Sequence, residues 1–181
     1  MTAILWEFSE GGTDLCVLER ADRGWRVAGT ALLAAEGAPV EIRYAVEVSR
    51  AWVTEDAEVV VSFPGGEVRK PFEVGGLWSG KERPPEFRDC QDVDLGFTPA
   101  TNTLPIRRLA LDVGEEADVS VTWLRWPELR IERAEQHYAR VAKDRYRFSS
   151  GDFSAELVVD EQGLVVDYEG LWRAIAREPG A

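Results

Sequence analysis

Apolar and polar residues alternate with a period of two along several stretches of the chain. In the clearest stretch, residues 40–48, Val, Ile and Tyr occupy every second position and the positions between them are mostly charged. Successive side chains of a strand point to opposite faces, so this pattern predicts a strand with one buried face. Similar patterns predict further strands at residues 4–8, 59–63, 68–74, 119–123, 153–159 and 164–168.

Turn-forming residues separate these predicted strands. Glycine, proline and aspartate gather at residues 11–12, 22–24, 64–66 and 160–163. Many short strands joined by such turns are typical of barrels and sandwiches rather than of βαβ units. The sequence therefore predicts a mainly β fold, a many-stranded antiparallel barrel or half-barrel. No internal repeat or shift in composition marks a boundary, so we expect a single domain over residues 1–181.

Helical patterns are scarce, and we expect only one or two short helices. Residues 170–177 predict a short terminal helix, because helical spacing would place Leu171, Trp172 and Ile175 on one face. Residues 134–141 fit helical spacing and strand alternation equally well, so two interpretations of this stretch stay open.

Tryptophan is unusually frequent, with seven residues against a single methionine. Large aromatic side chains fill the interior of β folds, each burying about 150–250 Å², and this role accounts for most tryptophans. A tryptophan can also line a ligand cavity, where it offers an apolar ring face and an N–H donor. Trp78, which follows two glycines and precedes a polar central segment, is the tryptophan we expect at a cavity wall.

The charge balance excludes several classes of partner. The formal net charge is −12 and the isoelectric point is near 4.6. Proteins that bind nucleic acids or anionic membrane surfaces do so through clustered Lys and Arg side chains, so neither is an expected partner of this acidic chain. No stretch approaches the roughly 20 apolar residues of a membrane span, and the N-terminus lacks the pattern of a secretory signal, so we expect a cytoplasmic protein.

The cysteine and histidine content predicts no metal and no cofactor. Cys16 and Cys90 are too few and too far apart for a disulfide framework or a zinc site, and both are expected to be buried thiols. Neither a metal-ligand cluster nor a glycine-rich phosphate loop is present.

Two aspartates and two arginines mark the segment 90–109. Asp92 and Asp94 are two residues apart, so on a strand they lie on the same face and repel each other. Arg107 and Arg108 follow one loop later, and in an extended continuation after Pro105 only one of them can reach the aspartates. The charges form either a structural network that closes the loop or part of a binding site, and the sequence leaves both open.

The loop between these charges is rich in hydrogen-bonding side chains. Thr98, Thr101 and Asn102 either satisfy the loop's own backbone groups or contact a ligand with many hydroxyl groups. The candidate ligand-binding residues are therefore Asp92, Asp94, Thr98, Thr101, Asn102 and Arg107, with Trp78 as an aromatic wall.

The run DVDLGFTPATNTLPIRRL at residues 92–109 resembles the signature of a bacterial family described as "Putative glycolipid-binding", formerly a domain of unknown function. The resemblance extends to residues 123–129, 136–138, 145–148 and 163–172, and so covers most of the chain. It implies an antiparallel barrel or half-barrel with little helix, distantly similar to bacterial lipoprotein carriers, and a glycolipid or other lipophilic ligand. It implies no catalytic residue.

Three functions follow as hypotheses. The first is binding of a glycolipid or another amphipathic ligand in a β cavity whose rim is polar, without catalysis. The second is a hydrolase for a glycoside or ester that uses Asp92 and Asp94, whose Cα atoms would lie about 6.6 Å apart on a strand. His137 is the single histidine, and no Gly-x-Ser-x-Gly motif accompanies it. The third is a protein-interaction domain, and the oligomeric state stays open.

Overall fold

The structure is a computed structural model, and it describes residues 1–63, 72–73 and 85–178. Contacts between residues divide the chain into two compact units. The first unit comprises Met1–Pro84 with Ala174–Ala181, and the second comprises Pro85–Arg173. The single domain over residues 1–181 stays a prediction.

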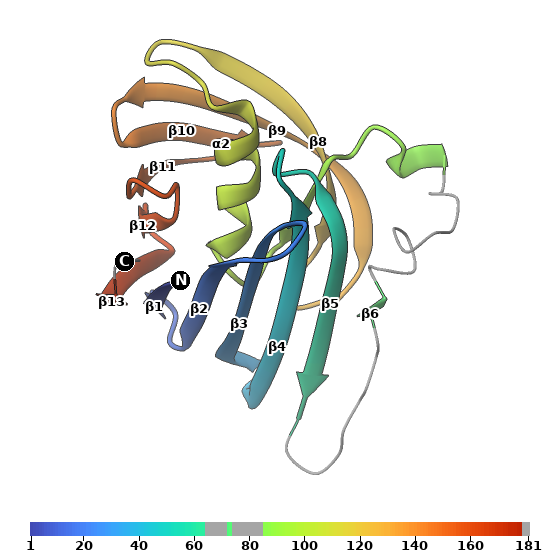
Figure 1. The fold of residues 1–181 in the computed structure, drawn as a ribbon. Coiled ribbons are helices and arrows are strands. Elements are labelled where there is room, and N and C mark those ends of the chain that lie inside the picture. The colour runs from blue at the N-terminus through green and yellow to red at the C-terminus, as the bar shows by residue number, and fades with distance from the viewer. Residues whose placement is uncertain (64–71, 74–84, 179–181) are drawn as a thin grey trace. The chain divides into compact units, whose positions relative to one another are not determined.

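In the first unit, strands β1 to β6 form an antiparallel meander in which neighbours in sequence pair with each other. Its strand order is β6-β5-β4-β3-β2-β1, followed by β13 (Figure 1). The strands are β1 Thr2–Phe8, β2 Thr13–Arg20, β3 Gly24–Ala35, β4 Ala38–Ser49, β5 Thr54–Ser62, β6 Phe72–Glu73 and β13 Trp172–Glu178. The alternation at residues 40–48 is confirmed in β4, where Val40, Ile42 and Val46 are buried and Arg43 is exposed.

The second unit is a curved sheet with a helix packed on it. Its strand order is β12-β11-β10-β9-β8-β7, and β12 also pairs with the first residues of β13. Strands β7 and β8 pair in parallel, whereas the other neighbours in this unit pair antiparallel. The elements are η1 Pro85–Phe87, β7 Asp92–Leu95, η2 Ala100–Asn102, α2 Thr103–Leu109, β8 Glu116–Leu124, β9 Ile131–Ala142, β10 Arg145–Ser150, β11 Phe153–Val159 and β12 Val165–Tyr168.

The predicted fold class, mainly β and many-stranded with short helices, is confirmed. The half-barrel form is clearest in the second unit, whose strands β8–β11 curve strongly (Figure 1). Residues 134–141 belong to a strand, β9, which settles the ambiguity between helix and strand. The predicted strand at residues 68–74 lies mostly outside the described residues. The described part of it, Phe72–Glu73, forms β6.

Two local predictions were wrong. Residues after Pro105 are not extended, because Thr103–Leu109 forms α2 with Pro105 in its first turn, where backbone N–H groups have no partner inside the helix. Residues 170–177 are not helical. The chain turns at Gly170, whose φ is +75°, and Trp172–Glu178 then forms strand β13. Within the described residues, no helix is long and apolar enough to cross a membrane.

Candidate functional site

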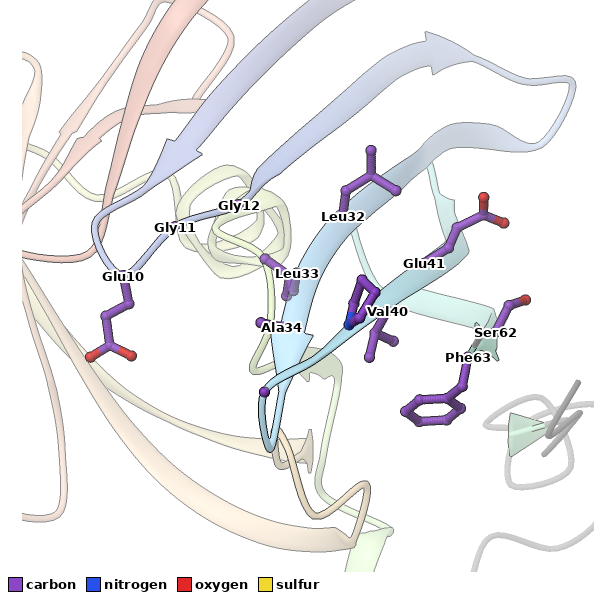
Figure 2. Close-up of a pocket in the computed structure, with 12 residues that line it drawn as sticks. Glu10, Gly11, Gly12, Leu32, Leu33, Ala34, Val40, Glu41, Ser62 and Phe63 are labelled. Carbon is purple, nitrogen blue, oxygen red and sulfur yellow. The ribbon is translucent and has the colours of Figure 1, made fainter. Parts of the chain in front are cut away.

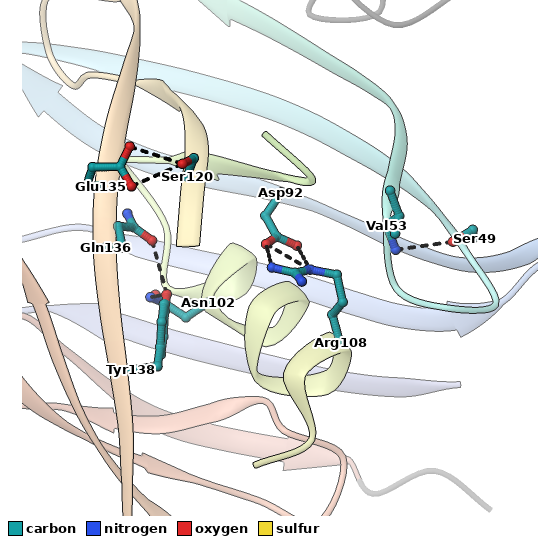
Figure 3. Close-up of polar contacts among 9 residues, drawn as sticks. All are labelled: Ser49, Val53, Asp92, Asn102, Arg108, Ser120, Glu135, Gln136 and Tyr138. Carbon is teal, nitrogen blue, oxygen red and sulfur yellow. Dashed lines mark hydrogen bonds and ion pairs between the residues drawn. The ribbon is translucent and has the colours of Figure 1, made fainter. Parts of the chain in front are cut away.

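Asp92 is held by Arg108 and is wholly buried. The guanidinium of Arg108 approaches both carboxylate oxygens, with Nε 3.1 Å from each and Nη2 2.6 Å from Oδ2 (Figure 3). Burial raises the pKa of the Asp92 carboxyl, and the hydrogen bonds and charge of Arg108 oppose that rise. The arginine that pairs with Asp92 is therefore Arg108, and it makes no ion pair with Asp94. Arg107 packs elsewhere, against Gly163. The Cδ of Arg107 lies 3.0 Å from the position that a Cβ at Gly163 would occupy.

Thr98 and Thr101 satisfy backbone groups of their own loop. The Ala100 N–H donates to Thr98 Oγ1 at 3.0 Å, and the Leu95 N–H donates to Thr101 Oγ1 at 3.1 Å. These bonds tie η2 to the end of β7 and fix the position of the loop. Both threonines are almost fully buried, so their first role is structural.

A directed chain of hydrogen bonds leads from the loop to Asp94. Asn102 Nδ2 donates to Tyr138 Oη at 2.9 Å, and Tyr138 Oη donates to Gln136 Oε1 at 3.3 Å (Figure 3). Gln136 Nε2 then donates to Asp94 Oδ2 at 2.5 Å. Burial raises the pKa of Asp94 to about 6, although the hydrogen bonds from Gln136 and Thr101 favour the carboxylate. The pKa of the Asp94 carboxyl therefore lies above that of an ordinary aspartate.

Asp94 lines a cavity of about 550 Å³ in the second unit, which we call the aromatic cavity. Its polar lining is formed by Asp94, Thr98, Asn102, Glu135, Gln136 and Ser150. Its apolar lining is formed by Trp123, Ala134, Phe148, Phe153, Tyr168, Leu171 and Trp172, and Gly96 and Gly151 complete it.

The aromatic wall of this cavity is a connected cluster centred on Phe148. The centroid of the Phe148 ring lies 5.1 Å from that of Tyr138, 6.1 Å from Tyr168 and 6.2 Å from Phe153. Strands β9, β10, β11 and β12 each contribute one of these rings, so the sheet itself positions them. Phe153 is 41 % exposed, although it is a large apolar side chain. The exposed part of the Phe153 ring is accessible to a ligand in the cavity, which it lines.

The predicted site residues divide into two groups. Asp94, Thr98 and Asn102 line the aromatic cavity. Asp92, Thr101 and Arg107 do not line it, and Trp78 lies outside the described residues. The sequence reasoning missed Gln136 and the rings of Phe148, Phe153, Tyr168 and Trp172. Gln136 and Tyr138 are two residues apart, as on one face of a strand, and this spacing was the signal that could have placed Gln136 beside Tyr138.

The residues proposed for hydrolysis do not converge. Asp94 lines the cavity, but both oxygens of Asp92 are taken by Arg108. The Nδ1 of His137 lies 2.7 Å from Asp118 Oδ1, and the Asp118 side chain is 83 % exposed. His137 neighbours Gln136 in β9, so its side chain points to the opposite face of the strand. Among the described residues, no group of three or more His, Cys, Asp or Glu side chains is placed to hold a metal ion.

A second and larger cavity, of about 740 Å³, lies in the first unit beside the β3–β4 hairpin. Leu33, Ala34 and Val40 line it from the hairpin, and Phe63 lines it from the end of β5 (Figure 2). Its lining is mainly apolar, and it lacks the linked set of polar side chains found around Asp94. The aromatic cavity is therefore the candidate functional site, because ligand sites combine an apolar wall with a few convergent polar groups.

A family model described as "Putative glycolipid-binding" matches residues 3–174. The chain belongs to this family. The match includes β7, the loop before α2 and every residue that lines the aromatic cavity. The similarity to lipoprotein carriers stays a prediction.

A solved structure supports the same assignment. The chain is similar to the crystal structure of a DUF1089 family protein from Pseudomonas aeruginosa, with a TM-score of 0.70 and 28% sequence identity. The similarity covers 88% of this chain and 91% of that chain. No curated protein matches the chain.

Proposed function

We propose that this member of the glycolipid-binding family binds an amphipathic ligand, such as a glycolipid, in the aromatic cavity. One observation carries the proposal: a wall of aromatic rings and a set of hydrogen-bonding side chains face the same cavity of about 550 Å³. That volume falls within the range of about 300–1,000 Å³ found for small-molecule sites. The ligand's apolar part contacts the rings and its polar part contacts Asp94 and its neighbours.

The apolar wall supplies the affinity in this proposal. Burial of a hydrocarbon chain contributes about 0.8 kcal/mol for each methylene group removed from water. Phe148, Phe153 and Tyr168 offer ring faces for such a chain, and Leu171 and Trp172 extend the surface. Preformed rings lose little conformational entropy when a ligand arrives.

The polar lining supplies orientation. A carboxylate accepts hydrogen bonds, and the amides of Asn102 and Gln136 both donate and accept them. Hydroxyl groups of a sugar match such a mixture, and sugar rings also pack against aromatic faces. Asn102 and Gln136 are held by Tyr138, so the polar side chains are in place before the ligand binds.

Native mass spectrometry tests the proposal. Protein purified from its own host is expected to carry a lipid adduct, and lipid-free protein is expected to take up octyl glucoside. Phe153→Ala should weaken octyl glucoside binding about tenfold, because an aromatic contact contributes on the order of 1–3 kcal/mol. Val141→Ala is the matched control, because Val141 is also 41 % exposed but does not line the cavity.

The outcome that contradicts the proposal is a protein that has its bare polypeptide mass and takes up none of the lipids offered. Equal losses of binding in Phe153→Ala and Val141→Ala would also contradict it, because they would place the ligand elsewhere.

The proposed compartment is the cytoplasm. Cys16 and Cys90 are both buried and form no disulfide, and cysteines outside disulfides are usual in a reducing compartment. The net charge of −12 makes nucleic acid an unsuitable partner in this proposal, since phosphate contacts need clustered cations.

A further inference from the structure

Asp94 brings a negative charge to the aromatic cavity, and no cation among the described residues pairs with it. Its carboxylate accepts hydrogen bonds from Gln136 and Thr101, and both of these donors are neutral. Within the described part of the chain Asp94 makes no ion pair, whereas Asp92, two residues earlier, is bound by Arg108. The two aspartates therefore have different electrostatic surroundings.

The described residues that line the aromatic cavity include no Lys, Arg or His. The other charged residue in the lining is Glu135, whose carboxylate is engaged by Arg133 and by Ser120 Oγ. Glu135 precedes Gln136 in β9, so its side chain points to the opposite face of the strand. An anionic ligand would therefore meet the charge of Asp94 with no compensating cation from the described lining, and like charges repel strongly where water is excluded.

Aromatic rings line the same cavity as this carboxylate. Burial is the main cause that raises the pKa of the Tyr138 and Tyr168 hydroxyls, and the nearby negative charge of Asp94 adds to it. Phe148 packs against both tyrosines. The faces of aromatic rings attract cations, and rings around a cation are a recurring means of recognising ammonium groups.

We propose that the polar group recognised in the aromatic cavity carries a protonated amine, which pairs with the Asp94 carboxylate beside the rings of Phe148 and Tyr168. This inference rests on the proposed function and deepens it. It names the ligand class as an ammonium-bearing amphiphile, and it excludes anionic lipids and fatty acids.

Three probes that share an eight-carbon chain test this inference: octylammonium chloride, octyl glucoside and sodium octanoate. Isothermal titration calorimetry at pH 7.5 and fixed ionic strength should show tightest binding for octylammonium and weakest for octanoate. Asp94→Asn keeps the size and hydrogen bonding of the side chain but removes its charge. We expect it to weaken octylammonium binding about tenfold, to strengthen octanoate binding, and to weaken octyl glucoside binding less than it weakens octylammonium binding.

Asp118→Asn is the matched control, because it makes the same change in net charge at a side chain that is 83 % exposed. It should leave the affinity of all three probes unchanged. A loss of octylammonium binding as large as that of Asp94→Asn would assign the preference to the protein's overall charge and overturn the inference.

The two proposals fail in different ways. Octyl glucoside binding without any preference for octylammonium over octanoate would overturn the charge inference alone. Absence of binding by all three probes would overturn the proposed function and the inference with it. The order of the three affinities in the wild type does not depend on any variant, and circular dichroism checks the fold of Asp94→Asn.

Discussion

The ion pair between Arg108 and Asp92 leads to a sharp prediction for stability. The Asp92 side chain is 0 % exposed and that of Arg108 is 16 % exposed, so water screens this pair weakly. Arg108→Ala leaves the carboxylate buried without a counter-charge, which costs roughly 3–5 kcal/mol. For a chain of this length, that loss lowers Tm by roughly 6–20 °C.

Two control variants separate this effect from a general loss of charge. Arg107→Ala removes the same charge from the neighbouring position of α2 and should cost less, because it does not take the counter-ion from Asp92. The double variant Asp92→Asn/Arg108→Ala removes both charges and should recover part of the loss, because no ion is left in the interior.

The pH dependence has a definite sign. Burial already raises the pKa of Asp92 above its ordinary value, and removal of Arg108 raises it further. A carboxyl whose pKa is higher in the folded than in the unfolded protein loses stability as pH rises through the folded value. The penalty of Arg108→Ala should therefore be smaller at pH 5 than at pH 8.

Urea unfolding followed by tryptophan fluorescence measures these differences. A loss of less than about 0.5 kcal/mol in the free energy of unfolding of Arg108→Ala would contradict the role of the ion pair. A double variant that is no more stable than Arg108→Ala would contradict it as well. The folded Arg108→Ala protein should still bind octyl glucoside, because Asp92 does not line the aromatic cavity. Lost binding in that folded variant would instead assign Arg108 to the site.

Two further predictions concern the hydrogen-bond chain. Asp94→Asn removes a carboxyl whose pKa rises from 3.8 to about 6, so it should stabilise the protein by on the order of 1–3 kcal/mol at pH 7.5 and by much less near pH 4. A gain in unfolding free energy that is constant with pH would contradict this origin. Tyr138→Phe removes a hydroxyl bonded to Asn102 and Gln136 and should cost about 1–3 kcal/mol. Tyr146→Phe is its control, since the Tyr146 hydroxyl makes no side-chain hydrogen bond to any described residue, and equal losses would refute the assigned role.

The strands with a simple apolar face could be predicted from the sequence. The alternation of apolar and polar residues at 40–48 matches the alternation of buried and more exposed positions in β4, because the buried positions of that strand are all apolar or aromatic. Strand β2 was not predicted, because its buried face includes Asp14 while Leu15 is 50% exposed. Asp14 accepts a hydrogen bond from the Tyr44 hydroxyl at 2.8 Å, and a pattern of hydropathy cannot show that a distant tyrosine allows an aspartate to be buried.

The candidate site could be predicted only in part, for a similar reason. Asp94, Thr98 and Asn102 were identified because they cluster within one short segment. The aromatic wall comes from residues 148, 153 and 168, which lie on separate strands and meet only when the second unit folds. The choice between Arg107 and Arg108 depended on α2, which turns Arg108 toward Asp92, whereas the sequence reasoning assumed an extended chain there.

The central claim is that the aromatic cavity of the second unit is the binding site. Backbone NMR shifts recorded during a titration with octyl glucoside test it most directly, because they report the location of the ligand as well as its affinity. We predict saturable shifts at Asp94, Gln136, Phe153 and Tyr168. Saturable shifts confined to the β3–β4 hairpin around Leu33, or no saturable shifts at all, would contradict the claim.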